Sequence, residues 1–440
     1  MAQTTELLTP GVEILYLDKL GYGPNGSMTR RAWREACLTN LLAGKEQFKA
    51  WQKQVLAEHT GAESALFDLC VNGVKEDFSL IYTNNSCTLD FSAYQFDHVV
   101  FASEFEFLLP CHFCFVTFNN SAELRKAVFK QEVIFHKAKF IVDAVFYGAV
   151  FYKDAWFTNS TFNFYAGFSN VTFSKDAWFK SATFSGHVRF GKAKFEGDSL
   201  FQSARFEKES DFENAEFEKV GHFEDASFKT TPPSFRGVDI ATTRLEFSKA
   251  IFPLNANSQQ AIDDLSFLKR LSDEHGQADQ ALNFNAMELR ARRLLPDAGW
   301  GFKVTTWLYE KVSDFGRSFT KPIGWYVALI CFGAVLAMGY STYFANPTKD
   351  EQKLCLPMEG QPPPLKLSYE RAVFEYAMFR AGGVMDFTDT GKQNNAVNCR
   401  LFDEPIEPVF MRGWGMLKGI ASIALLFLAA LGLRNKYRIK

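Results

Sequence analysis

Several features of secreted and nucleic-acid-binding proteins are missing from this 440-residue chain. Its eight cysteines are too few for a disulfide scaffold. Met1–Thr9 lacks the basic start and apolar run of a secretory signal peptide, so we expect none. The net charge of −2 gives no global basic field that would point to nucleic acid. With 22% charged and 47% apolar residues, disordered and fibrous classes fit poorly.

Catalytic and cofactor motifs are also missing. No P-loop, HExxH or GxSxG sequence occurs, and the seven histidines are scattered without metal-ligand spacing. Gly21–Gly26 matches GxGxxG, but helices rather than a βαβ unit are expected to follow, so we interpret it as a turn. Cys111 and Cys114 have CxxC spacing without a second pair, and we interpret them as small inward residues. The sequence therefore predicts a protein that is not an enzyme and has neither a metal site nor a cofactor.

Phenylalanine is the residue in excess, with 47 Phe against 14 Tyr and 8 Trp. Two series step by eleven positions and alternate by five and six, one from Phe113 through Leu124 to Phe223 and one from Phe118 to Phe228. A small residue, usually Ala, stands two positions before most of them. Spacings of five and six fit neither a helical stripe nor a strand alternation. They fit a square parallel β-helix, in which inward Phe rings stack in columns at roughly 4.8 Å.

These repeats resemble the pentapeptide-repeat family, whose units carry a small residue two places before a central Leu or Phe. The resemblance covers roughly residues 78–252 and implies a right-handed quadrilateral β-helix with the Phe side chains in its core. The sixth residue in alternate units is a departure, and it implies about 22 residues per coil and about seven coils. The rhythm weakens at Phe101–Pro110 and breaks at Pro232 and Pro233, where we expect loops or bulges.

Helical segments are predicted on both sides of the repeats. Residues 1–77 form an N-terminal cap with two helices, the first of which begins after Ser27. The β-helix then occupies residues 78–255. Residues 256–320 form a helical hairpin broken at Gly276 and a juxtamembrane helix, and residues 321–440 form a two-helix transmembrane domain.

Two apolar segments are predicted to cross a membrane. Trp325–Phe344 contains no charged residue and has the length of roughly 20 residues that a spanning helix needs. Leu417–Leu433 is a second apolar run. Basic residues precede the first span and follow the second, so both termini are expected in the cytoplasm of a bacterial-type inner membrane and residues 346–411 outside. The residues expected to face anionic lipid are Arg290, Arg292, Arg293, Arg434, Lys436 and Arg438.

The outer segment contains two features of interest. Cys355 and Cys399 could form a disulfide in an oxidising compartment, with two free thiols as the alternative. Leu367–Gly382 is predicted to be a short amphipathic helix followed by a Gly-containing return. This order of a first span, a short helix, a return and a second span resembles the layout of a two-span channel subunit. No TVGYG-type filter is present, however. The alternative is a helix packed on the membrane surface.

Candidate functional residues follow from this layout. The candidates for a pore or vestibule are Glu370, Glu375, Asp386, Asp389 and Lys418. Rings of the four carboxylates would favour cations, while Lys418 either lines the pore or reaches back to the interface. The candidates for packing between subunits are Gly415, Gly419 and Gly333.

Two functions are compatible with these predictions. The first is an oligomeric ion channel or pore with a cytoplasmic β-helix as its sensor or gating domain. Its chains would form a ring, most simply of four subunits. The second is a membrane-tethered scaffold whose β-helix binds a protein partner. The expected partners are membrane lipid, further copies of the same chain and a protein that binds the β-helix. Nucleic acid is not expected as a partner.

Overall fold

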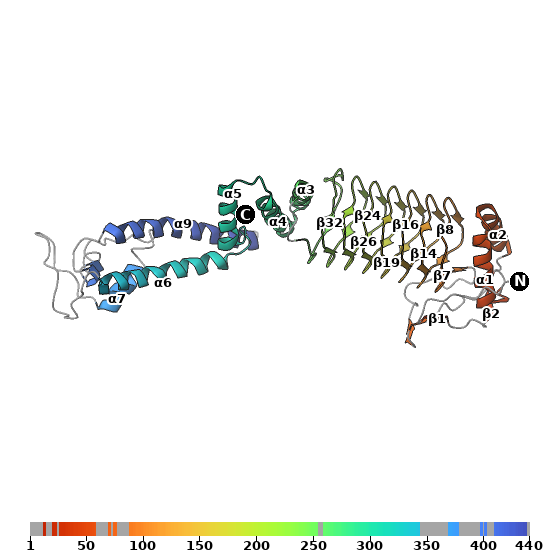
Figure 1. Ribbon diagram of the computed structural model, residues 1–440, viewed down its shortest axis with the longest axis horizontal. Coiled ribbons are helices and arrows are strands. Elements are labelled where there is room, and N and C mark those ends of the chain that lie inside the picture. The colour runs from red at the N-terminus through yellow and green to blue at the C-terminus, as the bar shows by residue number, and fades with distance from the viewer. Residues whose placement is uncertain are drawn as a thin grey trace, which may run out of the picture. The chain divides into compact units, whose positions relative to one another are not determined.

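A computed structural model describes residues 12–14, 20–23, 26–58, 69–71, 74–76, 88–253, 258–343, 368–377, 397–398, 400–402 and 409–437. The chain divides into two compact units, Met1–Pro296 and Asp297–Lys440. A solenoid of parallel strands flanked by helices makes up the first unit, and long helices dominate the second (Figure 1).

Four parallel sheets of two-residue strands form the sides of the solenoid. The first contains β6 (Leu89–Asp90), β10 (Cys111–His112), β14 (Val133–Ile134), β18 (Ala155–Trp156), β22 (Ala177–Trp178), β26 (Ser199–Leu200), β30 (Gly221–His222) and β32 (Leu245–Glu246). The second contains β7 (Gln95–Phe96), β11 (Thr117–Phe118), β15 (Lys139–Phe140), β19 (Thr161–Phe162), β23 (Thr183–Phe184), β27 (Arg205–Phe206) and β31 (Ser227–Phe228).

The other two sheets complete the square. The third contains β8 (Val100–Phe101), β12 (Ala122–Glu123), β16 (Ala144–Val145), β20 (Ala166–Gly167), β24 (Val188–Arg189) and β28 (Ser210–Asp211). The fourth contains β9 (Glu106–Phe107), β13 (Val128–Phe129), β17 (Val150–Phe151), β21 (Thr172–Phe173), β25 (Lys194–Phe195) and β29 (Glu216–Phe217). The predicted parallel β-helix of about seven coils is confirmed.

Columns of stacked Phe rings fill the interior. Each strand pairs with the strand one coil later, as Thr161 does with Thr183, which is the coil length that the sequence predicts. Phe179 is fully buried, and its ring centroid lies 4.9 Å from those of Phe157 and Phe201, the rings above and below it. Near-parallel rings at this separation add aromatic stacking to the burial of apolar area. The strict period of the sequence is therefore the period of the core.

The corners of the square alternate between two kinds. The core residues that directly follow the strands of the first and third sheets form the first and third columns. Two residues after each of these core residues the chain adopts positive φ, as at Asn159, Asn170 and Ser181. The turn is closed by a backbone hydrogen bond, as from Ser160 N to Phe157 O at 3.2 Å. At these tight corners, successive core Phe residues are five positions apart in the sequence. At the corners after the other two columns they are six positions apart, and the extra residue lengthens the corner. A left-handed non-Gly residue costs energy, so the tight corners are strained positions.

The two interruptions of the rhythm behave differently. The loop at Pro232 and Pro233 lengthens its coil, yet Phe235 still stacks on Phe212 at 4.8 Å. The prediction of a loop over Phe101–Pro110 is wrong, because β8 and β9 both lie in the sheets. Phe107 lies one coil before Phe129 and stacks on it at 4.5 Å.

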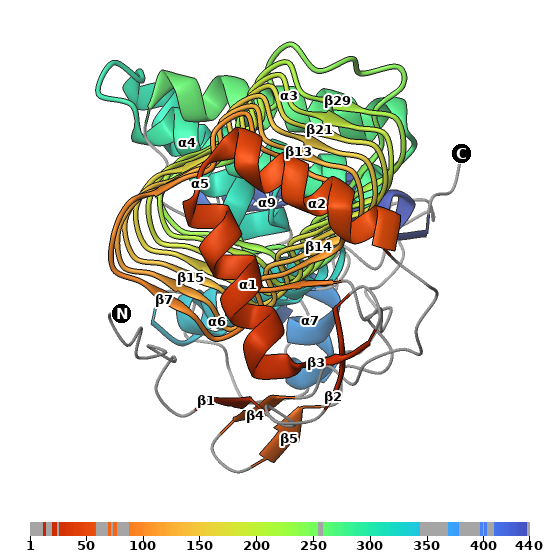
Figure 2. The same cartoon turned by 90° about the vertical axis from the view of Figure 1, so that its right-hand side faces the viewer.

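Helices lie across the first coil. α1 (Arg30–Leu42) and α2 (Lys45–Glu58) cross the end of the β-helix (Figure 2). Phe48 of α2 packs edge-on against Phe107 at 5.4 Å. Thr29 rather than Ser27 caps α1, since its Oγ1 accepts a hydrogen bond from Ala32 N at 3.2 Å. Two small antiparallel sheets complete the described residues of this region: β1 (Val12–Ile14), β4 (Leu69–Val71) and β5 (Val74–Glu76), and β2 (Leu20–Tyr22) with β3 (Met28–Thr29).

The predicted hairpin closes the other end of the β-helix. α3 (Gln259–Glu274) and α4 (Ala278–Leu294) are antiparallel neighbours joined through Gly276, whose φ is +67°. Phe284 of α4 packs edge-on against Phe247 and Phe252, the last rings of two columns. The hairpin therefore continues the aromatic core beyond the final coil.

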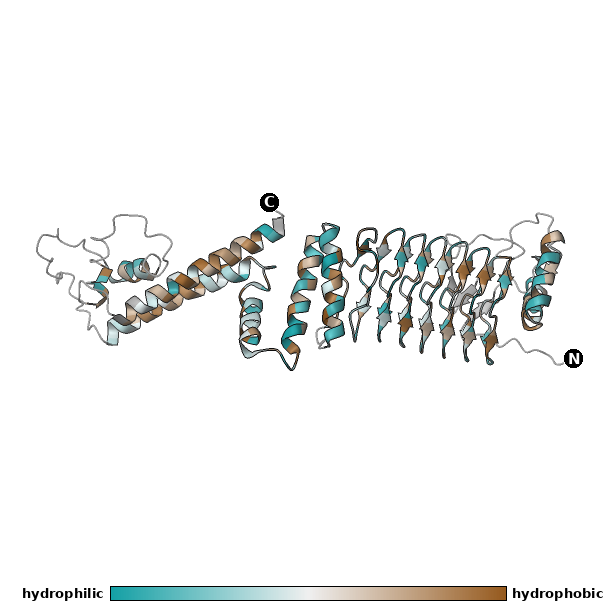
Figure 3. Ribbon diagram, turned by 90° about the horizontal axis from the view of Figure 1, so that it is seen from above, coloured by the Kyte–Doolittle hydropathy of each residue, from teal (hydrophilic) through white to brown (hydrophobic). Residues whose placement is uncertain are grey.

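The second unit contains α5 (Trp300–Ser313), α6 (Thr320–Tyr343), α7 (Tyr369–Glu375) and α9 (Val409–Tyr437). α6 and α9 run side by side, and much of both ribbons has the brown colour of hydrophobic residues (Figure 3). Thr320–Tyr343 and Gly413–Asn435 are long and apolar enough to cross a membrane, with mean hydropathies of 1.8 and 2.1. Only 11% and 28% of these apolar stretches is buried, so both helices expose a large apolar surface.

Candidate functional site

The short helix α7 packs against α6 and α9 rather than standing apart from them. Ala372, Val373 and Tyr376 share a buried apolar cluster with Ala337 of α6 and Met411 of α9. The Tyr376 hydroxyl donates a hydrogen bond to the Met411 carbonyl at 3.4 Å. Together these contacts fix α7 in the angle between the two long helices.

Lys418 of α9 contacts the residues that follow α7. Its side chain is 1% exposed, and its ammonium donates a hydrogen bond to the Ala377 carbonyl, two residues beyond Glu375. Lys418 therefore gives this buried backbone carbonyl a charged partner.

Gly333 of α6 makes room for this arrangement. A Cβ atom at this position would lie 3.4 Å from Lys418 Nζ and 3.5 Å from Trp414 Nε1. Ala337 and Ser341 follow at successive helical turns, and both are fully buried. The small residues of α6 thus serve the close approach of α9 within one chain.

These contacts fix the position of α7 along α6. Gly333 and Ala337 lie ten and six positions before Tyr343, the end of α6. At about 1.5 Å of rise per residue they are about 15 and 9 Å from that end. The end of α7 therefore lies beside the middle of α6 and not beyond it.

The predicted acidic vestibule is only partly described. Glu370 is exposed, whereas Glu375 is buried and its Oε1 accepts a hydrogen bond from Arg371 Nε at 2.9 Å. Asp386 and Asp389 lie outside the described residues, as do Cys355 and Cys399 of the predicted disulfide. The structure brings Glu375 and Lys418 to the same end of α7, and the cation-selective ring stays a prediction.

The remaining predicted residues fall on helices of both units. Gly419 is buried and Gly415 half-buried on α9, and their packing between subunits stays a prediction, as does that of Gly333. Arg292 pairs with Glu288 at 2.8 Å within the hairpin, while Arg434 is exposed on α9. Arg290 and Arg293 also lie on α4, and both have interactions in the structure. The Lys436 side chain and Arg438 lie outside the described part, and lipid contact of the six basic residues stays a prediction.

A buried ion cluster joins the cap to the first coil and was missed from the sequence. Asp90 accepts from Arg30 Nε at 2.9 Å and from Arg34 Nη1 at 3.1 Å, and all three side chains are fully buried. Burial opposes ionisation of Asp90, but the two guanidinium groups outweigh it and hold its pKa well below the usual value. His112, one coil above Asp90, has a pKa lowered to about 4 by burial. This cluster attaches α1 to the β-helix.

His222, Glu224 and Glu246 form a second cluster that spacing along the chain did not reveal. One ligand atom from each lies within 4.8 Å of the others, and His222 Nδ1 is 3.0 Å from Glu224 Oε1. An imidazole and two carboxylates could hold a zinc or manganese ion. Arg244, 3.7 Å from Glu246, competes for the same carboxylate. The residues meet because β30 and β32 are adjacent, although a full coil of the chain separates His222 from Glu246.

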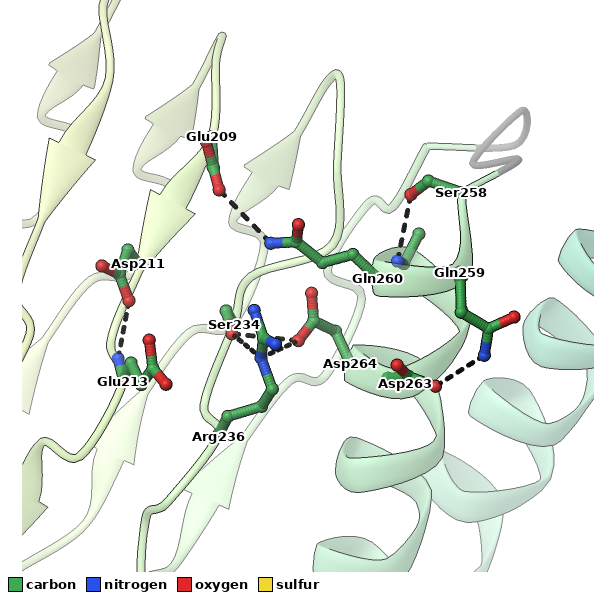
Figure 4. Close-up of polar contacts among 11 residues, drawn as sticks. Glu209, Asp211, Glu213, Ser234, Arg236, Ser258, Gln259, Gln260, Asp263 and Asp264 are labelled. Atoms are coloured by element: carbon green, nitrogen blue, oxygen red, sulfur yellow. Dashed lines mark hydrogen bonds and ion pairs between the residues drawn. The ribbon is translucent and has the colours of Figure 1, made fainter.

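Asp264 forms a third polar site where α3 meets the last coil (Figure 4). It is 2% exposed, and its Oδ1 accepts from Ser234 Oγ at 2.9 Å and lies 3.5 Å from Arg236 Nε. Burial raises the pKa of Asp264 to about 6, although Ser234 and Arg236 act in the opposite direction. The negative charges of Asp263 and Glu209 also raise the pKa of Asp264.

Comparison with known proteins supports the interpretation of the repeats. A family model described as "Pentapeptide repeats (9 copies)" matches residues 116–161, 143–183, 157–205 and 179–227. No curated protein and no solved structure matches the chain. The pentapeptide-repeat resemblance is thereby confirmed for the central β-helix, and the chain is a repeat solenoid with two apolar helices that are compatible with membrane association.

Proposed function

We propose that the protein is an oligomeric membrane channel or pore whose β-helix serves as a cytoplasmic sensor or gating domain. One observation carries the proposal: α7 lies beside the middle of α6, and Lys418 donates a hydrogen bond to the Ala377 carbonyl just beyond it. A helix packed on the outer surface of a membrane would instead meet α6 near Tyr343. The depth of α7 therefore favours a re-entrant helix between two spans.

The chemistry at the end of α7 supports a location inside the bilayer. Unpaired backbone carbonyls are costly in hydrocarbon, so an irregular segment at membrane depth needs polar partners from the protein. Lys418 is such a partner for the Ala377 carbonyl. In water this contact would not be needed, because solvent would satisfy the same carbonyl.

Two spans in one chain cannot enclose a path for water, so the proposal requires a ring of chains. Closed rotational symmetry is the usual arrangement, and we propose four subunits. The basic residues at the ends of α6 and α9 favour a cytoplasmic location for both termini and the β-helix, at a bacterial-type inner membrane. In this proposal the protein has no catalytic activity.

Conductance across planar bilayers tests this function. Purified full-length protein should produce discrete current steps, and Lys418→Met should change their amplitude or abolish them because α7 loses its attachment. Lys321→Met is the matched control, since this lysine is exposed at the start of α6 and should leave the steps unchanged. A protein that gives no current and has the mass of a single chain would refute the proposal.

A membrane-tethered scaffold is the second candidate. Trp156 and Trp178 are stacked at 4.3 Å on the outside of the first sheet, and both remain partly exposed. Aromatic residues on a solenoid face are suited to bind a protein partner. In that case Trp156→Ala with Trp178→Ala should abolish cross-linking to the partner in cells and leave membrane insertion intact.

A further inference from the structure

The helix α5 exposes an apolar stripe to its surroundings. Trp300, Val304, Trp307 and Leu308 occupy positions i, i+4, i+7 and i+8 of a helical face. Their side chains are 80%, 41%, 52% and 52% exposed. Two indole rings and two aliphatic side chains on one short helix form an apolar patch that water does not favour.

The opposite face of α5 contains two buried hydroxyls, together with Phe302, which is 38% exposed, and the half-buried Tyr309. Thr306 is 6% exposed and Ser313 is fully buried, and each hydroxyl donates a hydrogen bond to a carbonyl of its own helix. A helix on the surface of a water-soluble protein buries its apolar stripe and exposes its hydroxyls. α5 has the reverse arrangement, which indicates that the medium outside its stripe is not water.

The C-terminal end of α5 is fixed at one end of the α6–α9 pair. Trp325 Nε1 of α6 donates to the Lys311 carbonyl at 3.3 Å, and Asn435 Nδ2 of α9 donates to the Gly316 carbonyl at 3.0 Å. α5 itself runs across the direction of α6 and α9 (Figure 1). If the two long helices cross a bilayer, α5 therefore lies at its surface and roughly in its plane.

Basic residues occur on α5 and near the ends of the long helices, and one of them, Arg317, pairs with Asp314 at 2.8 Å. Lys303 and Lys311 lie on α5, and Arg317, Lys321 and Arg434 lie near the ends of the long helices. Each Lys or Arg near an anionic membrane surface contributes about 1 kcal/mol to binding. Tryptophan is also the residue most typical of the boundary between headgroups and acyl chains.

We propose that α5 is an interfacial helix whose stripe of Trp300, Val304, Trp307 and Leu308 inserts into the headgroup region of the anionic leaflet next to Arg434. The inference rests on the proposed membrane function of α6 and α9. Its occupant is lipid, chosen because the end of α5 contacts Trp325 of α6, itself 52% exposed, and because Lys303 and Lys311 lie on the same helix as the stripe.

Quenching of tryptophan fluorescence by brominated lipid tests this inference. The full chain is reconstituted into vesicles of brominated phosphatidylglycerol and phosphatidylcholine, and the quenched fraction of emission is compared with that in unbrominated vesicles. Of the eight tryptophans, Trp325 and Trp414 lie on the long helices and two lie on α5. If all four contact lipid, quenching should reach roughly one half of the emission.

Paired variants separate the two claims. Trp300→Phe with Trp307→Phe should lower the quenched fraction to roughly one third, because two lipid-exposed indoles are lost. As a control, Trp156→Phe with Trp178→Phe should raise it to roughly two thirds, because these β-helix indoles are shielded from lipid. Conservative Phe substitutions at exposed positions leave the fold intact.

The outcomes are distinct. A quenched fraction that stays the same or rises in the α5 variant would overturn the inference. The stripe would then be in contact with a second copy, another part of the chain or water instead of lipid. If Trp325→Phe with Trp414→Phe also fails to reduce quenching, the long helices do not contact lipid and the proposed function fails with it. A reduction for the long helices without one for α5 would refute the interfacial helix alone.

Discussion

Replacement of Asp264 by Asn should stabilise the protein at neutral pH. The carboxylate is 2% exposed at the junction of α3 with the last coil, and burial raises its pKa to about 6 from 3.8. A group with a raised folded-state pKa favours folding most below its unfolded pKa, and this contribution is lost as pH rises through about 6. At pH 7.5 the wild-type protein therefore carries an ionised carboxylate in an unfavourable position.

The size of the effect follows from the pKa. The change from 3.8 to about 6 corresponds to about 3 kcal/mol at 1.36 kcal/mol per unit of pKa. An amide keeps the hydrogen bond from Ser234 but loses the attraction of the half-exposed Arg236, which is worth up to about 1 kcal/mol. We therefore expect Asp264→Asn to gain about 2–3 kcal/mol at pH 7.5.

Thermal unfolding of the full chain in detergent measures this gain. Asp264→Asn should raise the midpoint at pH 7.5 by roughly 4–12 °C, and the gain should fall to roughly half at pH 5 and vanish well below pH 3.8, where the carboxyl is protonated in both the folded and the unfolded state. Asp263→Asn is the matched control, since Asp263 precedes it on α3 and is exposed. The same difference in unfolding midpoint between wild type and variant at both pH values would refute the reasoning. A variant that is less stable than the wild type at pH 7.5 would also refute it.

Three further substitutions test the packing. Phe179→Ala, in the middle of an aromatic column, should cost about 3–5 kcal/mol in unfolding free energy, whereas Phe164→Ala, 62% exposed, should stay within about 0.5 kcal/mol. Asp90→Asn should cost about 3–5 kcal/mol because it leaves two buried guanidinium groups without their anion, and an unchanged melting temperature would contradict the buried cluster. Gly333→Leu should separate α6 from α9, measured as faster protease cleavage near α7; unchanged cleavage would argue against the close approach.

The sequence predicted the β-helix well because its signal is repeated in every coil. A Phe at every eleventh position is a local pattern, and stacking it at strand spacing leaves few alternatives. Phe107 shows where the prediction erred: the nearby Phe105 obscured its phase, although Phe107 stands one full coil before Phe129. The spacing of five and six reveals that two kinds of corner alternate, but not that the tight ones place a residue such as Asn159 at positive φ.

The polar sites could not be predicted in the same way. Asp90 meets Arg30 and Arg34 although much of the N-terminal cap separates them in the sequence, and His222 meets Glu246 across a lengthened coil. Such contacts depend on which side of the square each residue occupies. Lys418 stands out in the sequence as a charge in an apolar helix, and its role in a pore stays a prediction. Its partner in the structure is a backbone carbonyl, and backbone groups leave no trace in a sequence pattern.

Imaging of single particles in lipid nanodiscs tests the central claim most directly. The account predicts several chains around one axis, with α6 and α9 in the disc, α7 within its outer half and a water-filled path between the subunits. Particles containing a single chain, or rings in which α7 lies outside the lipid, would contradict it.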